Sequence, residues 1–223
     1  MSWGPLILSF KLALLTTLIL LLIATPIAYW LSRSKSKFKP VVQAIVSLPL
    51  VLPPTVIGLY FLLAFSPNNA FGAWLNDWFG IRLVFTFPGL VIASIIYSLP
   101  FMVQPIHAGL AELPSSLTEA SYVLGKSKWA TLRKVLIPNI KGSLLIGAVL
   151  TFAHTIGEFG IVYMIGGSRP DITQVASIAI YDEVEASNYD MANQYALILI
   201  GIMFTILLFV YLLNGGYLKR FRR

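Results

Sequence analysis

Charged residues are scarce in this sequence of 223 amino acids, and cysteine is absent. Asp, Glu, Lys and Arg together make up 11% of the chain, whereas a soluble domain usually carries roughly a quarter. Hydrophobic residues make up 57%. Because so few charges cannot cover a water-facing surface, the composition predicts an integral membrane protein.

What the sequence lacks also excludes or disfavours several kinds of chemistry. Without cysteine there are no disulfides and no thiolate metal ligands. The two histidines, His107 and His154, belong to no spaced cluster with carboxylates, so no metal site is expected. The Gly-x-x-x-x-Gly-Lys-Ser/Thr pattern is missing, so we do not expect this chain to hydrolyse ATP. No nucleophile lies beside a base in the apolar stretches, which disfavours a membrane enzyme.

Five apolar stretches are long enough to cross a bilayer, which needs about 20 residues per helix. They predict an all-α, polytopic membrane protein. Pro49, Pro53 and Pro54 fall within the second stretch and remove backbone donors, so a kinked or interrupted helix is expected there. The five predicted spans are residues 6–31, 41–65, 88–106, 143–165 and 195–213.

The charges between the predicted spans alternate in sign from loop to loop. Lys and Arg dominate the first loop, the third loop and the C-terminal tail, whereas acids dominate the fourth loop. Short loops rich in Lys and Arg stay in the cytoplasm. We therefore expect the N-terminus outside and the C-terminus and residues 107–141 in the cytoplasm. Membrane orientation then explains the net charge of +7 without nucleic acid. The basic residues are Arg33, Lys35, Lys37 and Lys39 in the first loop, Lys126, Lys128, Arg133, Lys134 and Lys141 in the third, and Lys219, Arg220, Arg222 and Arg223 in the tail.

The second loop, residues 68–87, contains a group of aromatic residues interleaved with glycines. Phe71, Trp74, Trp78 and Phe79 have rings that favour the headgroup level, so a short interfacial helix is expected. The alternative is a contact surface for an external partner.

The third loop contains signals for two short helices. Ser116 and Glu119 have the spacing of a capping box, which predicts a helix start. Gly125 suits the left-handed conformation that ends a helix, and a second helix is expected from about Ser127. The expected apolar sides are Leu117, Ala120 and Leu124 on the first helix and Trp129, Leu132 and Leu136 on the second.

A short helix between two spans has two interpretations. It can fit into a cleft of another protein, with the small Ala120 permitting close approach and Glu119 anchoring a basic partner. It can also be an ordinary amphipathic helix that lies on the membrane. These physical arguments alone leave both interpretations open.

The same stretch resembles the EAA loop of ABC importer permeases, which begins Glu-Ala-Ala, continues to a Gly and ends in Leu-Pro at fixed spacing. The corresponding positions here hold Glu119-Ala120-Ser121, then Gly125, then Val135-Leu136-Ile137-Pro138. Ser121, Val135 and Ile137 are conservative departures from the pattern, and the spacing matches throughout. The likeness extends over residues 6–214, which it implies to be a single transmembrane domain.

This resemblance implies a type I ABC importer fold, acting as a homodimer in the cytoplasmic (inner) membrane of a bacterium or archaeon. In that family the loop is a coupling helix that occupies a groove of a separate ATP-binding subunit. The resemblance implies two copies of that subunit, which uses ATP and Mg while the permease binds no cofactor, and an extracytoplasmic substrate-binding protein. An ATP-independent channel is the alternative from a different class. The coupling residues implied are Glu119, Ala120, Ser121, Gly125, Val135, Ile137 and Pro138.

Within that family the sequence is most similar to molybdate permeases, in residues 48–58, 77–81, 98–100 and 155–160. Tungstate and sulfate permeases are relatives, and sulfate permeases more often carry Tyr at the position of Phe159. No Lys or Arg falls in the central part of a predicted span, and a strong central site would slow release. We therefore expect selectivity to reside mainly in the separate binding protein, with tungstate and sulfate as alternative substrates.

Glu158 lies within the fourth predicted span, where an ionisable residue is costly and usually faces protein or water. At helical spacing Thr151, His154, Thr155 and Glu158 form one polar stripe, in which His154 and Glu158 can pair. One interpretation is a lining or gate of the pathway. The other is a packing device at the subunit interface, with Gly157 and Gly160 permitting close helix contact.

Pro53 and Pro54 have a similar pair of interpretations. They break the second span either to satisfy packing or because the break lies near the translocation path, as broken helices in transporters do.

Related permeases often carry Arg at the position of His154, so a salt bridge typical of them is not assured here.

Overall fold

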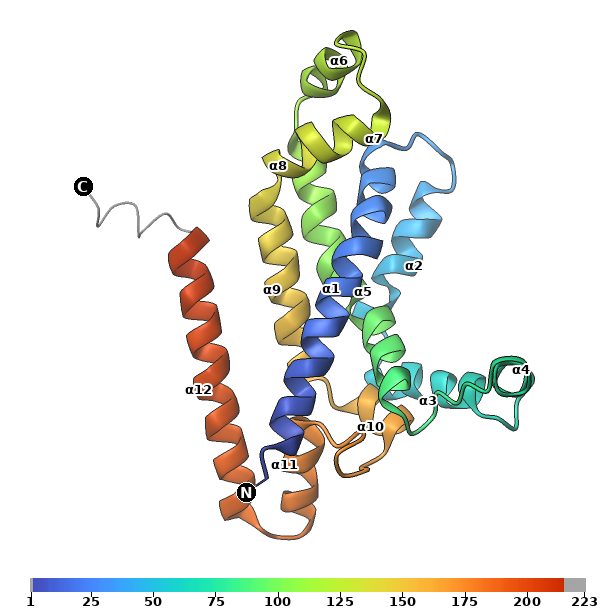
Figure 1. Cartoon of the computed structure of the whole chain (residues 1–223), viewed down its shortest axis with the longest axis vertical. Coiled ribbons are helices and arrows are strands. Elements are labelled where there is room, and N and C mark those ends of the chain that lie inside the picture. Colours follow the sequence, from blue (N-terminus) through green and yellow to red (C-terminus); the bar gives the residue numbers. More distant parts are fainter. Residues whose placement is uncertain (1, 215–223) are drawn as a thin grey trace.

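The structure is a computed structural model that describes residues 2–214, with side chains to residue 212. The described part consists of helices and loops and contains no β-strand, which confirms the predicted all-α class (Figure 1). The helices are α1 (Gly4–Arg33), α2 (Lys39–Val51), α3 (Pro54–Phe65), α4 (Ala70–Phe79), α5 (Phe87–Glu112), α6 (Ser115–Val123), α7 (Lys128–Thr131), α8 (Ile137–Asn139), α9 (Lys141–Gly157), α10 (Gly160–Gly166), α11 (Ala176–Glu185) and α12 (Tyr189–Asn214), with a π-helical segment, Leu132–Leu136, between α7 and α8.

Four helices form a bundle that positions the other elements. α5 packs against α1, α2 and α9, and α1 also packs against α9 (Figure 1). One end of this bundle carries α6, α7 and α8, and the other end carries α10 and α11. α3 and α4 project sideways, and α12 stands apart with contacts chiefly to α11.

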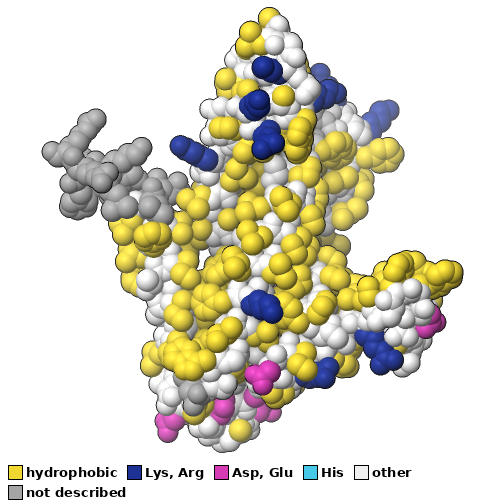
Figure 2. Space-filling model, in the orientation of Figure 1, with side chains coloured by type: hydrophobic (Ala, Val, Ile, Leu, Met, Phe, Trp, Pro, Cys, Tyr) yellow, Lys and Arg dark blue, Asp and Glu magenta, His cyan; other side chains and the backbone are white. Residues whose placement is uncertain are grey.

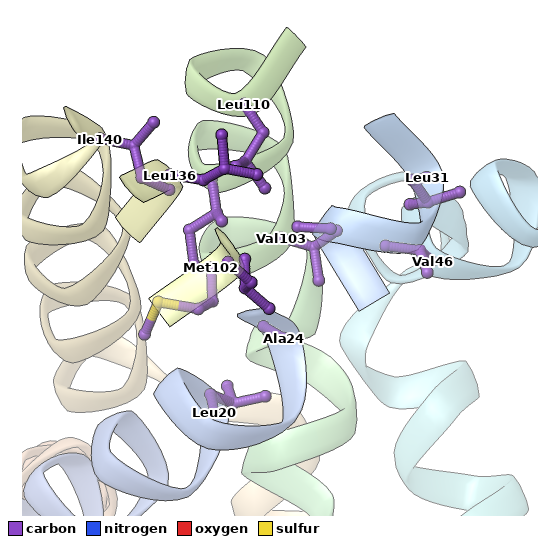
Figure 3. Close-up of a cluster of buried hydrophobic side chains, with 12 residues drawn as sticks. Leu20, Ala24, Leu31, Val46, Met102, Val103, Leu110, Leu136 and Ile140 are labelled. Carbon is purple, nitrogen blue, oxygen red and sulfur yellow. The ribbon is translucent and has the colours of Figure 1, made fainter. Parts of the chain in front are cut away.

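A buried apolar cluster holds the bundle together near the end that carries α6–α8 (Figure 3). Met102 on α5 and Leu136 on the π-helical segment are fully buried in it, beside Leu20 of α1 and Val46 of α2. Lipid tails are as apolar as these side chains, so close packing rather than removal from water stabilises the contact within a membrane.

Within the described residues, three helices are long and apolar enough to cross a membrane without interruption: α1, α5 and α12. Two bent pairs supply up to two further spans, namely α2 with α3, and residues 128–139 with α9. The predicted second span is α2 plus α3, whose axes are bent by 108°. The expected kink or interruption is therefore confirmed.

The break in the second span follows directly from its proline pair. Leu52 precedes Pro53 and adopts an extended conformation, as residues before proline prefer. Pro53 and Pro54 have no backbone N–H, so they cannot continue the hydrogen bonding of α2. Pro54 instead begins α3, where a missing donor is tolerated.

The fourth predicted span, residues 143–165, is not continuous, which corrects the sequence interpretation. α9 ends at Gly157, Glu158 is extended, and α10 begins only at Gly160. Helical periodicity did not reveal this break, because the break depends on contacts of Glu158 with residues far away in the sequence.

Charge is separated along the bundle. Figure 2 shows most of the visible Lys and Arg around the end with α6–α8 and most of the visible Asp and Glu around the end with α11, with a few Lys and Arg in the lower half of the view. The predicted basic first and third loops thus share one end. The basic tail residues, Lys219, Arg220, Arg222 and Arg223, lie outside the described residues.

The two loops at the opposite end contain helices of their own. α4 confirms the short helix expected in the aromatic second loop. α11 was not predicted, because its acidic residues suggested a simple loop. Its first backbone N–H, from Ala176, donates to the Ser9 hydroxyl of α1 at 2.7 Å, so the start of α11 is fixed by a helix far away in sequence.

Candidate coupling helix and buried carboxylate site

The start of α6 differs from the predicted capping box. Pro114 occupies the capping position, and no side chain caps the helix. Ser116 is the second residue of α6, so its hydroxyl is not placed for the predicted role and Glu119 falls in the second turn. The sequence signal was wrong because the rigid backbone of Pro114, at φ −61° and ψ 141°, already starts the helix.

The end of α6 confirms the expected role of Gly125. This residue has a φ of +71°, a left-handed conformation that costs other L-residues about 1–2 kcal/mol. Its N–H donates to the carbonyl of Tyr122 at 2.9 Å, and the N–H of Lys126 donates to the carbonyl of Ser121 at 3.1 Å. These bonds satisfy carbonyls that the helix end leaves free.

The surface of α6 that faces away from the bundle combines an acid with apolar side chains. Glu119 and Ala120 are exposed, and Val123 and Leu124 are 87% and 75% exposed. Figure 1 places α6 at the far tip of the molecule. Two large apolar side chains in this position favour a protein partner that covers them.

Ser121, the departure from the Glu-Ala-Ala pattern, forms a contact that alanine would lack. It is buried, and its hydroxyl lies 2.9 Å from that of Thr131 on α7. The Thr131 hydroxyl donates to the carbonyl of Ser127 at 3.0 Å, so the Ser121 hydroxyl is the donor in the pair. This bond fixes α6 against α7.

The second helix of the loop begins where predicted, because the Ser127 side chain accepts from the N–H of Ala130 at 3.2 Å. Val135 and Ile137 are half-buried against the apolar cluster, whereas Pro138 is exposed at the start of α8. Val135 and Ile137 therefore anchor the loop to the bundle, and all three residues lie away from the tip.

The predicted apolar sides of the loop helices hold only in part. Leu132 and Leu136 are buried, whereas Trp129 is 66% exposed. On α6, Leu117 is half-buried while Ala120 and Leu124 face outward. The tip therefore exposes apolar residues that the helical period assigned to packing.

The side chain of Glu158 is fully buried at the break between α9 and α10. Ser94 donates to its Oε2 at 2.6 Å, and Ser98 donates to its Oε1 at 2.7 Å. His154 Nδ1 lies 3.3 Å from the same Oε1. Ser98 also lies 3.0 Å from the hydroxyl of Thr155. Hydroxyl donors from α5 thus stabilise a carboxylate that would otherwise be costly to bury.

His154 lies beside the same serine. Its Nδ1 is 2.9 Å from the Ser98 hydroxyl oxygen, and which of the two groups donates depends on the tautomer of the ring. The ring is held from the side by Phe101, whose centroid is 4.0 Å away.

α11 supports the same break from the outside. The Ser177 hydroxyl donates to the main-chain carbonyl of Glu158 at 2.5 Å. Phe159 packs against Tyr163 and Tyr181, with ring centroids 5.4 and 4.9 Å away. Tyr181 of this aromatic group lies near the Glu185 carboxylate. The negative charge of Glu185 is the main cause that raises the pKa of the Tyr181 phenol.

A cavity of about 510 Å³ lies beside the break and extends to Pro54 and Thr55 at the start of α3. Gly160 packs closely there, because a Cβ at this position would lie 3.0 Å from the Cβ of Pro54. A Cβ on Gly157 would meet no atom within 4 Å, so close packing does not require glycine at that position. The lining includes Pro54, Thr55, His154, Gly157, Glu158 and Gly160.

The structure joins some of the predicted pathway residues and separates others. His154, Thr155 and Glu158 share one network, but the buried hydroxyl of Thr151 has no hydrogen-bond partner. Pro53 and Thr151 do not line the cavity. Sequence reasoning missed the role of Ser94 and Ser98, although two serines four residues apart within a span were a usable signal for a polar partner of Glu158.

The described residues offer no evident metal site. Within residues 2–212, no three His, Asp or Glu side chains are grouped so as to hold a metal ion.

A family model described as "Binding-protein-dependent transport system inner membrane component" matches residues 24–223. The chain belongs to this family. Among the relatives of this inner membrane component, the molybdenum transport system permease protein ModB of Azotobacter vinelandii is 42% identical over 92% of this chain and 90% of that protein. The sulfate transport system permease protein CysT of Escherichia coli (strain K12) is 30% identical over 86% of this chain and 69% of that protein.

Solved structures give the same fold for this inner membrane component. A bacterial ABC transporter involved in the import of the acidic polysaccharide alginate superposes with a TM-score of 0.76 at 19% identity, over 96% of this chain and 80% of that one. An inward-facing conformation of the MetNI methionine ABC transporter superposes with a TM-score of 0.67 at 18% identity, over 96% and 93%. The chain therefore has the transmembrane fold of ABC importers and is a multi-pass membrane protein.

Proposed function

We propose that this chain is the permease of an ATP-driven importer that carries molybdate across the cytoplasmic membrane. The observation that carries the proposal is the tip of α6, where Glu119, Val123 and Leu124 are exposed at the far end of the molecule. A separate ATP-binding subunit covers this tip and drives the spans between two states. That subunit uses ATP and Mg, and the permease itself binds no cofactor.

The proposed orientation has the N-terminus outside and the C-terminus in the cytoplasm. Its support is the separation of charge, since the first and third loops are basic and share the α6 end (Figure 2). Loops rich in Lys and Arg stay in the cytoplasm. The α6 tip then faces the compartment that contains ATP.

Two copies of the chain enclose the path in this proposal. The bundle alone has too few helices for a wide pore, and α12 is almost unburied, with only 6% of its apolar window covered. This leaves apolar surface for lipid and for the second copy. Two ATP-binding subunits then dock on the two α6 tips.

An oxyanion passes the break between α9 and α10 without meeting a fixed attractive charge. The cavity wall offers Thr55, Tyr97 and His154, and the carboxylate of Glu158 is turned toward the serines of α5. Weak binding here permits release. Selectivity then belongs to an extracytoplasmic binding protein that delivers the anion.

Molybdate is proposed as the substrate because the relative at 42% identity is a molybdenum transport permease. Sulfate is the second candidate, favoured by a sulfate transport relative at 30% identity. Tungstate is nearly the same anion as molybdate.

The test is uptake of radioactive molybdate into proteoliposomes that contain the permease, its ATP-binding subunit and its binding protein. We expect uptake only with ATP, and stronger competition from tungstate than from sulfate. Uptake that proceeds equally without ATP would show a channel. Uptake of sulfate in preference to molybdate would assign the second candidate.

A further inference from the structure

A second cavity, of about 300 Å³, lies between the last turns of α1 and the third loop. Tyr29 and Arg33 line it from α1, Thr118 and Tyr122 from α6, and Lys128 from α7. It shares no lining residue with the cavity beside Glu158. The site described above therefore does not account for it.

Three of the polar side-chain atoms at this cavity lack partners. Arg33 Nε and Nη2 and the hydroxyl of Thr118 are buried and form no hydrogen bond. Within residues 2–212, neither Arg33 nor Lys128 forms an ion pair. A buried donor without an acceptor is costly, and a charged one more so. An acceptor from outside the chain would remove this cost.

The donors converge on the cavity from three elements. The guanidinium of Arg33 presents a planar fork and Lys128 a compact charge, while Thr118, Tyr29, Tyr122 and Ser34 add hydroxyls. A planar carboxylate uses two directions, whereas a tetrahedral oxyanion accepts from several. We propose that this cavity binds a phosphate-class oxyanion that bridges α1 to α6 and α7.

Two sources supply this chemistry. A lipid phosphate is one, because basic pockets beside membrane helices bind anionic headgroups and Trp30 lines the cavity with its ring partly exposed. A free inorganic oxyanion is the other. In either case the ligand fixes the helix that carries Glu119 to the end of α1.

The first arm of the test uses the full chain in nanodiscs of phosphatidylcholine. Inorganic phosphate and, separately, molybdate are titrated while thermal unfolding is followed by tryptophan fluorescence. If the natural ligand is a free inorganic oxyanion, both the natural chain and the control variant Lys35→Gln gain thermal stability. Lys35 serves as the control because it is an exposed cation of the first loop that does not line the cavity. Arg33→Gln and Lys128→Gln then need about tenfold more anion, since each loses a charge-assisted bond.

The second arm detects a lipid source. In this arm the nanodiscs contain phosphatidylglycerol in place of pure phosphatidylcholine. Native mass spectrometry then counts the anionic lipids that the purified chain retains. If the source is lipid, the natural chain and Lys35→Gln retain phosphatidylglycerol, whereas Arg33→Gln and Lys128→Gln retain about tenfold less. Thr118→Val, which removes the buried hydroxyl and keeps the shape, also weakens binding without unfolding the chain.

The proposal is overturned if neither phosphate, molybdate nor phosphatidylglycerol binds more tightly to the natural chain than to Arg33→Gln and Lys128→Gln. The binding arms contain no ATPase, so their result does not depend on the proposed function.

Discussion

At the scale of single residues, the buried carboxylate of Glu158 depends on two hydroxyls from another helix. Ser94 and Ser98 each donate to one of its oxygens at 2.6 and 2.7 Å. A hydrogen bond to a charged group contributes about 1.5–3 kcal/mol in water-soluble proteins, and somewhat less in membranes. The pairing therefore determines whether the charge is tolerated at the break.

Removal of both serines should lower the free energy of unfolding more than removal of the Glu158 charge that they stabilise. We expect Ser94→Ala with Ser98→Ala to destabilise the chain by about 2–4 kcal/mol. Addition of Glu158→Gln to that pair should restore part of this loss, because no buried charge is left without donors. Thermal unfolding of the purified chain measures both. A triple variant that is less stable than the double variant would contradict the account.

Glu158→Gln alone tests what the carboxylate does for transport. The amide keeps the shape of the side chain but has only one oxygen to accept from the two serines. We therefore expect slower ATP-dependent uptake or weaker assembly of the two copies. Uptake in proteoliposomes and cross-linking of the two copies measure these. If both are normal, neither a gate nor a packing role is tenable.

The Ser121–Thr131 pair should respond unequally to removal of its two hydroxyls. Ser121→Ala leaves Thr131 with its bond to the carbonyl of Ser127, so it should cost about 1 kcal/mol or less. Thr131→Val removes both bonds and leaves the buried Ser121 hydroxyl without its partner, so it should cost about 1–3 kcal/mol. Chemical unfolding compares the two. Equal losses would show that the pair does not fix α6 to α7 as described.

At the scale of elements, the break between α9 and α10 is held by contacts on three sides. The serines of α5 bind the Glu158 side chain, Ser177 of α11 binds its carbonyl, and Gly160 meets Pro54 of α3. Two broken spans thus touch at their breaks. A movement of α3 relative to α10 would directly change the shape of the cavity, because both helices line it.

Two glycines in this break provide a matched comparison. Gly160→Ala places a methyl group 3.0 Å from the Cβ of Pro54, so α10 or α3 must shift by a few tenths of an ångström, and we expect lower stability and slower uptake. Gly157→Ala meets nothing within 4 Å and should be neutral, or stabilising by up to about 1 kcal/mol. Unfolding and uptake assays on both variants measure the contrast. Similar effects of the two changes would refute the close contact.

The sequence predicted the elements better than their contacts. The proline pair at 53 and 54 predicted a break, and Gly125 predicted a helix end, because each has a local backbone cause. The interruption at Glu158 was not predicted, since it depends on partners about 60 residues away on α5. The capping box failed for a local reason, because Pro114 precedes Ser116 and starts the helix itself.

At the scale of the whole molecule, the α6 tip and the cavity at Glu158 lie at different levels of one bundle. α5 connects them, since it carries Ser94 and Ser98 along its length and leads into α6 at its end. The apolar cluster around Met102 and Leu136 ties α5 to the third loop (Figure 3). The third loop, which carries the tip, is therefore packed directly onto the bundle.

The most direct test of the central claim pairs ATP-dependent molybdate uptake with ATP hydrolysis in proteoliposomes. Glu119→Lys reverses an exposed charge at the tip, and Glu112→Lys makes the same change on an exposed residue at the end of α5. We predict that Glu119→Lys lowers uptake about tenfold or more, by loss of an interfacial charge contact, while Glu112→Lys stays near the natural rate. Full uptake by the Glu119→Lys permease would contradict the docking of an ATPase on α6.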